Sequence, residues 1–90
     1  MSVKINIHSF FSHLTNGQEI VEANGNTVGQ CLEHLVTQFP GLRKWLFEKD
    51  GKLNRLVDIY VNLESSYPEE LAKPVKDGDE LHIIVIISGG

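Results

Sequence analysis

The sequence has few of the residues that mark several common classes of protein. Its 90 residues include one cysteine, so the chain can form no internal disulfide and no cysteine-rich metal site. Acidic residues outnumber basic ones by 12 to 8, for a net charge of −4, which disfavours a nucleic-acid-binding protein because such proteins normally carry a basic face. No apolar run approaches the roughly 18 residues of a membrane span, and the N-terminus shows no signal-peptide pattern. We therefore expect a cytoplasmic protein that binds neither membranes nor nucleic acids.

The composition fits one small folded domain over residues 1–90. Hydrophobic residues make up 41% of the chain and charged residues 22%, as in ordinary globular proteins. A chain of this length buries about 60–65% of the surface that its unfolded form exposes. Such a domain is too small for most enzymes with a deep pocket, and the sequence contains no nucleotide-binding loop or catalytic triad that local spacing supports.

Alternating apolar residues predict strands at both ends of the chain. Residues 3–7 alternate between branched apolar and polar side chains, which is typical of a strand with one face on a core. Residues 18–23 follow the turn signal Asn16-Gly17 and predict an antiparallel partner for the first strand. Residues 57–62 and 80–87 predict two more strands.

A helix is expected between the second and third of these strands. Thr27 is a suitable N-cap, and Pro40-Gly41 provides a stop. Between them, apolar residues recur at the spacing of a single helical stripe: Val28, Cys31, Leu32, Leu35, Val36 and Phe39. Cys31 is therefore expected to be a buried structural thiol. Residues 42–49 predict a short second helix. Residues 63–74 predict an irregular segment, because Pro68 and Pro74 interrupt regular structure.

This order of elements predicts an α+β protein with a mixed sheet and one long helix across one face. A β-grasp arrangement satisfies the order. In that arrangement the first and last strands lie side by side and parallel at the centre of the sheet, where strands can be apolar on both faces.

The last strand carries apolar side chains toward both faces of the sheet. Ile84 and Ile86 are expected to face away from the helix, beside Tyr60 of the third strand. Two interpretations stay open: an exposed apolar patch that docks a partner protein, or a patch covered by the segment around Phe10 and Phe11. The opposite face would carry four residues toward the helix: Leu81, Ile83, Val85 and Ile87.

The sequence ends in Ser88-Gly89-Gly90, directly after this strand. Glycine loses the most backbone entropy on folding, and two glycines have no Cβ to clash in a narrow channel. The Gly90 carboxylate is inert until it is activated, and adenylation by ATP is the usual means. The ending therefore suggests access to the active site of another enzyme, although a frayed or truncated terminus is the alternative.

Over essentially its whole length the sequence resembles the ubiquitin-like sulfur carriers of the MoaD/ThiS type. The chain is longer than the typical thiamine or molybdopterin carriers, and the extra residues lie around 42–56. In this region, and in the pattern of residues 51–62, the sequence is similar to the carriers that serve cysteine or homocysteine synthesis. Besides the first strand, the matching pieces are the helix after Asn26-Thr27-Val28, the strand at 57–62, the turn at 76–80 and the terminal Ser88-Gly89-Gly90.

The resemblance implies that the chain is a sulfur carrier and not an enzyme. An E1-like adenylating enzyme would bind the sheet at Ile84, Ile86 and Tyr60, and would convert the Gly90 carboxylate to an acyl-adenylate with ATP. A sulfur donor would then displace AMP and leave a thiocarboxylate on Gly90, while Gly89 and Ser88 give access.

The resemblance also implies a second partner. This sulfur-accepting enzyme would act in cysteine/homocysteine, thiamine or molybdopterin biosynthesis. The carrier itself would bind no cofactor and no metal. The alternative hypothesis is a ubiquitin-like modifier that is joined to lysines through the same tail.

Overall fold

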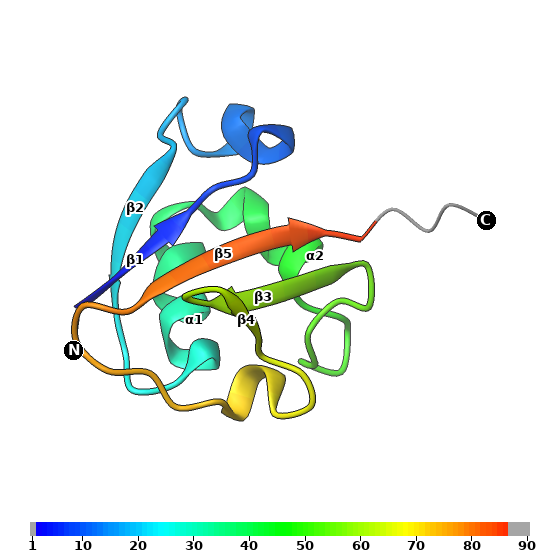
Figure 1. Ribbon diagram of the computed structural model, residues 1–90. Coiled ribbons are helices and arrows are strands. Elements are labelled where there is room, and N and C mark those ends of the chain that lie inside the picture. Colours follow the sequence, from blue (N-terminus) through cyan, green and yellow to red (C-terminus); the bar gives the residue numbers. More distant parts are fainter. Residues whose placement is uncertain (1, 87–90) are drawn as a thin grey trace.

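The computed structural model describes residues 2–86 (Figure 1). The predicted Ser88, Gly89 and Gly90 lie outside the described residues, as does Ile87. Within residues 2–86 the strands are β1 (Ser2–Asn6), β2 (Ile20–Asn24), β3 (Val57–Val61), β4 (Glu64–Ser65) and β5 (Glu80–Val85). The α-helices are α1 (Val28–Gln38) and α2 (Arg43–Leu46), and the 3₁₀ helices are η1 (Ser9–Leu14), η2 (Pro40–Leu42) and η3 (Glu70–Ala72).

The strands form one mixed sheet in the order β2-β1-β5-β3-β4. β1 and β5 are parallel neighbours at its centre, with Lys4 opposite Glu80 and Asn6 opposite His82. The other neighbouring strands are antiparallel, and α1 and α2 lie behind the sheet in Figure 1. The predicted β-grasp arrangement is confirmed, including the central parallel pair.

The core lies between the sheet and α1. The helix begins where Thr27 Oγ1 accepts a hydrogen bond from the Gln30 amide at 3.1 Å, as predicted for an N-cap. Its apolar stripe is buried from Val28 to Val36. The stripe packs on the inner face of the sheet, where six side chains are at most 2% exposed: Val3, Ile5, Ala23, Ile59, Leu81 and Ile83.

Three segments differ from the sequence prediction. The second helix ends at Leu46, because Phe47 is extended and pairs with Leu53 in an isolated bridge. The β1–β2 connection contains η1, and residues 63–74 contain β4 and η3. 3₁₀ helices of one or two turns arise from local backbone hydrogen bonds. Neither they nor a two-residue strand such as β4 leave a periodic pattern in the sequence. The longest helix in the described part has 11 residues, and none there is long and apolar enough to cross a membrane.

Candidate docking surface at the end of the central strand

β5 leads from the centre of the sheet toward the predicted tail. Its last pair joins Val85 to Val57 of β3. One residue later, the Ile86 amide donates to the Leu56 carbonyl oxygen at 2.7 Å. The ladder therefore continues to Ile86, the last described residue, and fixes the point at which residues 87–90 begin.

A turn centred on Asn54 positions the Leu56 carbonyl. Asn54 Oδ1 accepts from the Leu56 amide at 2.9 Å, and the Asn54 carbonyl accepts from the Val57 amide at 3.0 Å. The Asn54 amide in turn donates to the Leu46 carbonyl at the end of α2, at 2.8 Å. The role of Asn54 was not predicted from the sequence. An asparagine just before an apolar strand is the signal, because its side chain commonly bonds to the backbone two residues later.

The predicted docking residues of β5 face away from the helices. Ile84 and Ile86 are 38% and 46% exposed, whereas Ile83, whose side chain points to the opposite face, is buried. The interpretation that Phe10 and Phe11 cover this patch is wrong. Phe11 is buried in the core, and the rings of both phenylalanines pack on each other and on Trp45.

Tyr60 lies on the same face but not directly beside Ile84. The residue opposite Ile84 on β3 is Asp58, and Tyr60 lies opposite His82. Asp58 is held in place because its Oδ2 accepts from Ser65 Oγ at 2.7 Å. Tyr60 is therefore a diagonal neighbour of Ile84, and a carboxylate borders the apolar patch.

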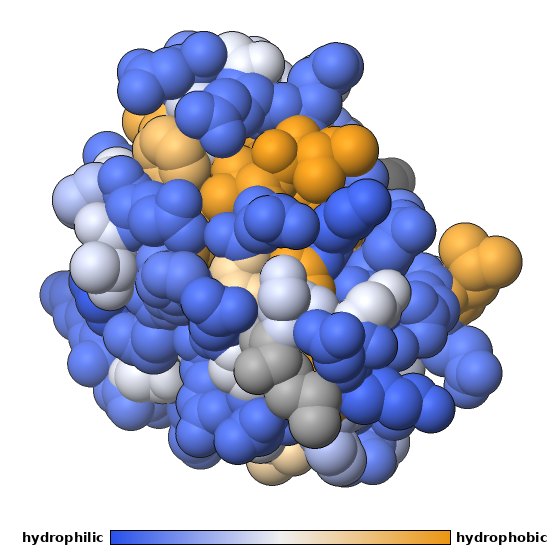
Figure 2. Space-filling view, turned by 90° about the vertical axis from the view of Figure 1, so that its left-hand side faces the viewer, coloured by the Kyte–Doolittle hydropathy of each residue, from blue (hydrophilic) through white to orange (hydrophobic). Residues whose placement is uncertain are grey.

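The strand registers extend this outer face across the sheet. Asn6 pairs with both Ile20 and His82, and His82 pairs with Tyr60, so these four side chains form one row on the face opposite α1. Ile20 is 55% exposed at the β2 edge. Figure 2, seen from the β2 side, shows an apolar patch surrounded by hydrophilic residues. The outer face thus carries apolar side chains at the β2 edge as well as at the end of β5, where Leu56 is also exposed.

Cys31 is not available as a nucleophile. Its side chain is buried, and burial raises the pKa of the thiol. A Cβ on Gly25 would come within 3.0 Å of Cys31 Sγ, so the backbone closes tightly over the sulfur. The prediction of a buried structural thiol is confirmed. Within residues 2–86, no three His, Cys, Asp or Glu side chains are grouped so that they could hold a metal ion.

Comparison with known proteins agrees with this architecture. The family model of the ThiS family matches residues 9–90. The sulfur carrier protein CysO of Mycobacterium tuberculosis is 34% identical over 93 residues, which cover 100% of each chain. A chain in the crystal structure of the Amycolatopsis orientalis BexX/CysO complex is 32% identical, with a TM-score of 0.88 over 98% of this chain and 99% of that one. SAMP1 from Haloferax volcanii is 27% identical, with a TM-score of 0.85 over 100% of both chains. Because the family match and the full-length relative both span nearly all of its sequence, this chain belongs to the ThiS family.

Proposed function

We propose that this protein is a sulfur carrier that receives and donates sulfur as a thiocarboxylate on Gly90. One observation carries the proposal. The chain aligns over its full length with the sulfur carrier CysO, and in its sequence two residues separate Gly89-Gly90 from Ile86, up to which the central strand is hydrogen-bonded.

The proposed chemistry begins with activation of the carboxylate. A Gly90 carboxylate oxygen attacks the α-phosphorus of ATP, and pyrophosphate leaves. Sulfide, as HS⁻, then attacks the carbonyl carbon of the acyl-adenylate, AMP leaves with the bonding electron pair, and the sulfur loses its proton to solvent. The product is a thiocarboxylate, whose sulfur is a better nucleophile than the oxygen it replaces.

The carrier contributes presentation rather than acid–base catalysis. β1 pairs with the first half of β5, at residues 80–82, whereas β3 pairs with β5 as far as Val85 and the Leu56 carbonyl binds the Ile86 amide. The base of the tail is therefore held from the β3 side. The four residues after Ile86 can span at most about 14 Å when fully extended. The active site of a partner enzyme must therefore approach the end of β5 closely, which favours docking on the surface next to it.

The proposed first partner is an E1-like adenylating enzyme that binds the outer face through Ile84, Ile86 and Tyr60. The BexX/CysO structure is a complex of a related chain with another protein, which supports protein partners in general. Apolar side chains surrounded by polar ones match the usual composition of an interface core and rim.

The proposed second partner is the enzyme that accepts the sulfur. In the amino-acid branch its substrate is a PLP-bound or O-activated precursor of cysteine or homocysteine, whose leaving group the thiocarboxylate sulfur displaces. Thiamine and molybdopterin biosynthesis are the other destinations. We place this ATP-dependent exchange in the cytoplasm, with no cofactor bound to the carrier itself.

A specific observation also supports the alternative function. This chain is 27% identical to SAMP1 of Haloferax volcanii and 26% identical to SAMP1 of Methanosarcina acetivorans. The second of these proteins is described as a small archaeal modifier protein. As a modifier, the activated Gly90 would form an isopeptide bond with a lysine of another protein. Trypsin cleaves after lysine and arginine, and the last such residue of this chain is Lys76, so target lysines that carry residues 77–90 after digestion would reveal that product.

The test is intact-mass spectrometry of the full chain incubated with a cognate adenylating enzyme, ATP and a sulfur donor. We expect a species in which one oxygen is replaced by sulfur, and none when ATP is omitted. The variant that lacks Gly90 serves as the control and should remain unchanged. Absence of the sulfur species under conditions that form the acyl-adenylate would refute the thiocarboxylate proposal.

A further inference from the structure

A groove of about 1300 Å³ lies on the helical side of the domain, between α1, α2 and the 47–54 loop. Its apolar lining includes Pro40, Phe47 and Leu71. The backbone reaches the surface of the groove at Gly29, where a Cβ would come within 3.0 Å of the Leu71 carbonyl oxygen. α1 and α2, which contribute to this lining, lie behind the sheet in Figure 1, so the groove and the outer face of the sheet belong to opposite layers of the domain.

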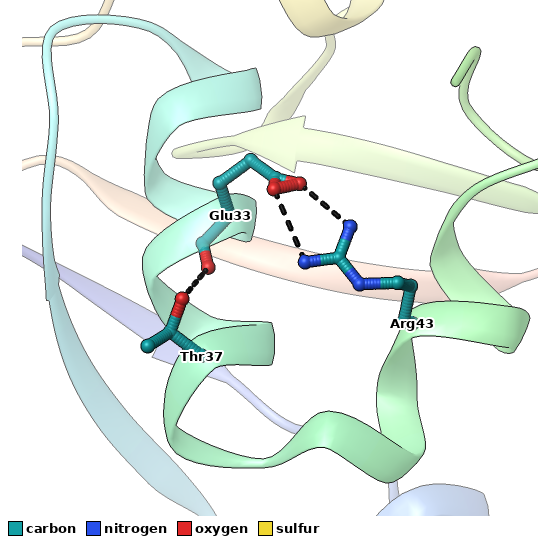
Figure 3. Close-up of polar contacts among 3 residues, drawn as sticks. All are labelled: Glu33, Thr37 and Arg43. Atoms are coloured by element: carbon teal, nitrogen blue, oxygen red, sulfur yellow. Dashed lines mark hydrogen bonds and ion pairs between the residues drawn. The ribbon is translucent and has the colours of Figure 1, made fainter.

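The acidic side chains that line the groove already have partners. Arg43 donates two hydrogen bonds to Glu33, at 2.9 and 3.3 Å (Figure 3). The Arg43 guanidinium also lies 5.8 Å from the centre of the Phe47 ring. Glu48 accepts from the Arg55 amide at 3.0 Å and forms a 3.6 Å ion pair with the Arg55 side chain.

Two lysines in the lining are left without such partners. Lys44 and Lys49 are exposed at the groove and form no ion pair within residues 2–86. The groove therefore presents an apolar floor with two uncompensated positive charges, on a chain whose net charge is −4. That combination differs from the outer face, where the apolar Ile84 borders the carboxylate of Asp58.

We infer that this groove binds an acidic segment of a partner protein. An aromatic or large aliphatic side chain of the segment packs on Phe47 and Pro40, and its carboxylates lie at Lys44 and Lys49. Charge complementarity of this kind sets specificity and association rate. A nucleic acid fits less well, because its affinity depends on neutralising many phosphates, and among the described residues of this lining two lysines lack an ion-pair partner.

The consequence is simultaneous binding of two partners. An enzyme that holds the tail and the outer face leaves the helical side uncovered, so a second protein can bind the carrier before the first dissociates. Only this consequence rests on the proposed carrier function. The groove's preference for acidic segments stands on its own residues and is measured separately.

The test is a titration of the ¹⁵N-labelled full chain, followed by NMR, with three acetylated and amidated synthetic pentapeptides. Each has a central phenylalanine, flanked by acidic, neutral or basic residues. We expect the acidic peptide to cause saturable shifts at α1, α2 and residues 47–54, with an affinity about tenfold above that of the basic peptide.

A pair of charge variants localises the effect. Lys44→Glu with Lys49→Glu should weaken binding of the acidic peptide about tenfold. Gln18→Glu with Asn24→Asp and Lys76→Glu makes the same change in net charge at exposed positions outside the groove, and should alter the affinity less than about twofold because distant exposed charges are screened.

Three results would overturn the inference: equal affinity for all three peptides, shifts confined to β5, or no saturable binding at millimolar peptide. An equal loss of affinity in the groove variant and in the control variant would also contradict it, because net charge alone would then explain the binding. Failure to form a thiocarboxylate would refute the proposed function without changing these titrations, so the two proposals fail separately.

Discussion

The two faces of β5 show how one strand can serve both stability and recognition. Toward α1, Leu81 and Ile83 are buried and belong to the main core. Away from α1, His82 is half-buried and Ile84 is exposed next to Asp58. Since successive side chains point to opposite faces, substitutions at adjacent positions should separate the two roles.

The largest effect on stability is expected on the inner face. Ile83→Ala should lower the free energy of unfolding by about 2–5 kcal/mol, because it removes buried methyl groups and leaves a cavity. Urea denaturation of the full chain measures this change. The matched Ile84→Ala variant should cost less than about 1 kcal/mol. Equal losses in both variants would mean that the two faces do not differ in burial.

The next effect concerns recognition on the outer face. Ile84→Lys places a cation opposite Asp58, which suits the fold, but introduces a charge into the proposed apolar interface. We expect an unchanged free energy of unfolding. The affinity for the adenylating enzyme, measured by titration calorimetry, should fall about tenfold or more. Ile84→Asp is a poorer test, because it would set two carboxylates opposite each other. Unchanged affinity of the Ile84→Lys variant would remove this residue from the interface.

A smaller effect is expected at the turn that holds the base of the tail. Asn54→Ala removes the acceptor of the Leu56 amide and should cost about 1 kcal/mol of stability. If the turn positions Ile86, hydrogen exchange of the Ile86 amide should accelerate more than that of the Ile83 amide. Asn24→Ala, at an exposed position at the end of β2, is the control. Equal acceleration at both amides would indicate that the substitution lowers the stability of the whole domain and that the turn does not specifically position Ile86.

The smallest effect concerns the dependence of stability on pH. Burial raises the pKa of Cys31 above its ordinary value of 9.0, so above that pH the unfolded chain binds fewer protons than the folded one. Stability should therefore fall as the pH rises from 9.0 toward the folded pKa. Cys31→Ala should flatten this part of the profile in urea denaturation at several alkaline pH values. An unchanged slope would mean that other groups cause the decline.

The parts predicted from sequence are those that periodicity determines. Alternation in β1, β3 and β5 and the stripe of α1 reflect burial on one face, so they identify the sheet, the helix and the outward position of Ile84. The neighbour of Tyr60 could not be predicted in this way. Register depends on turns and pairings between distant segments, and these place His82 opposite Tyr60.

The groove was equally inaccessible to sequence reasoning, for a related reason. Its lining combines α1, α2, the 47–54 loop and Leu71, which come together only when the extended Phe47 turns the chain back after α2. No single stretch of sequence contains this surface. Surfaces built from several short irregular segments are where local patterns carry the least information.

The most direct test of the account is to locate the sulfur. After incubation of the full chain with adenylating enzyme, ATP and a labelled sulfur donor, tandem mass spectrometry of the C-terminal peptide should place the label on the carboxyl group of Gly90. Label on Cys31, or retained only by noncovalent association, would contradict the central claim that this protein carries sulfur on its terminal glycine.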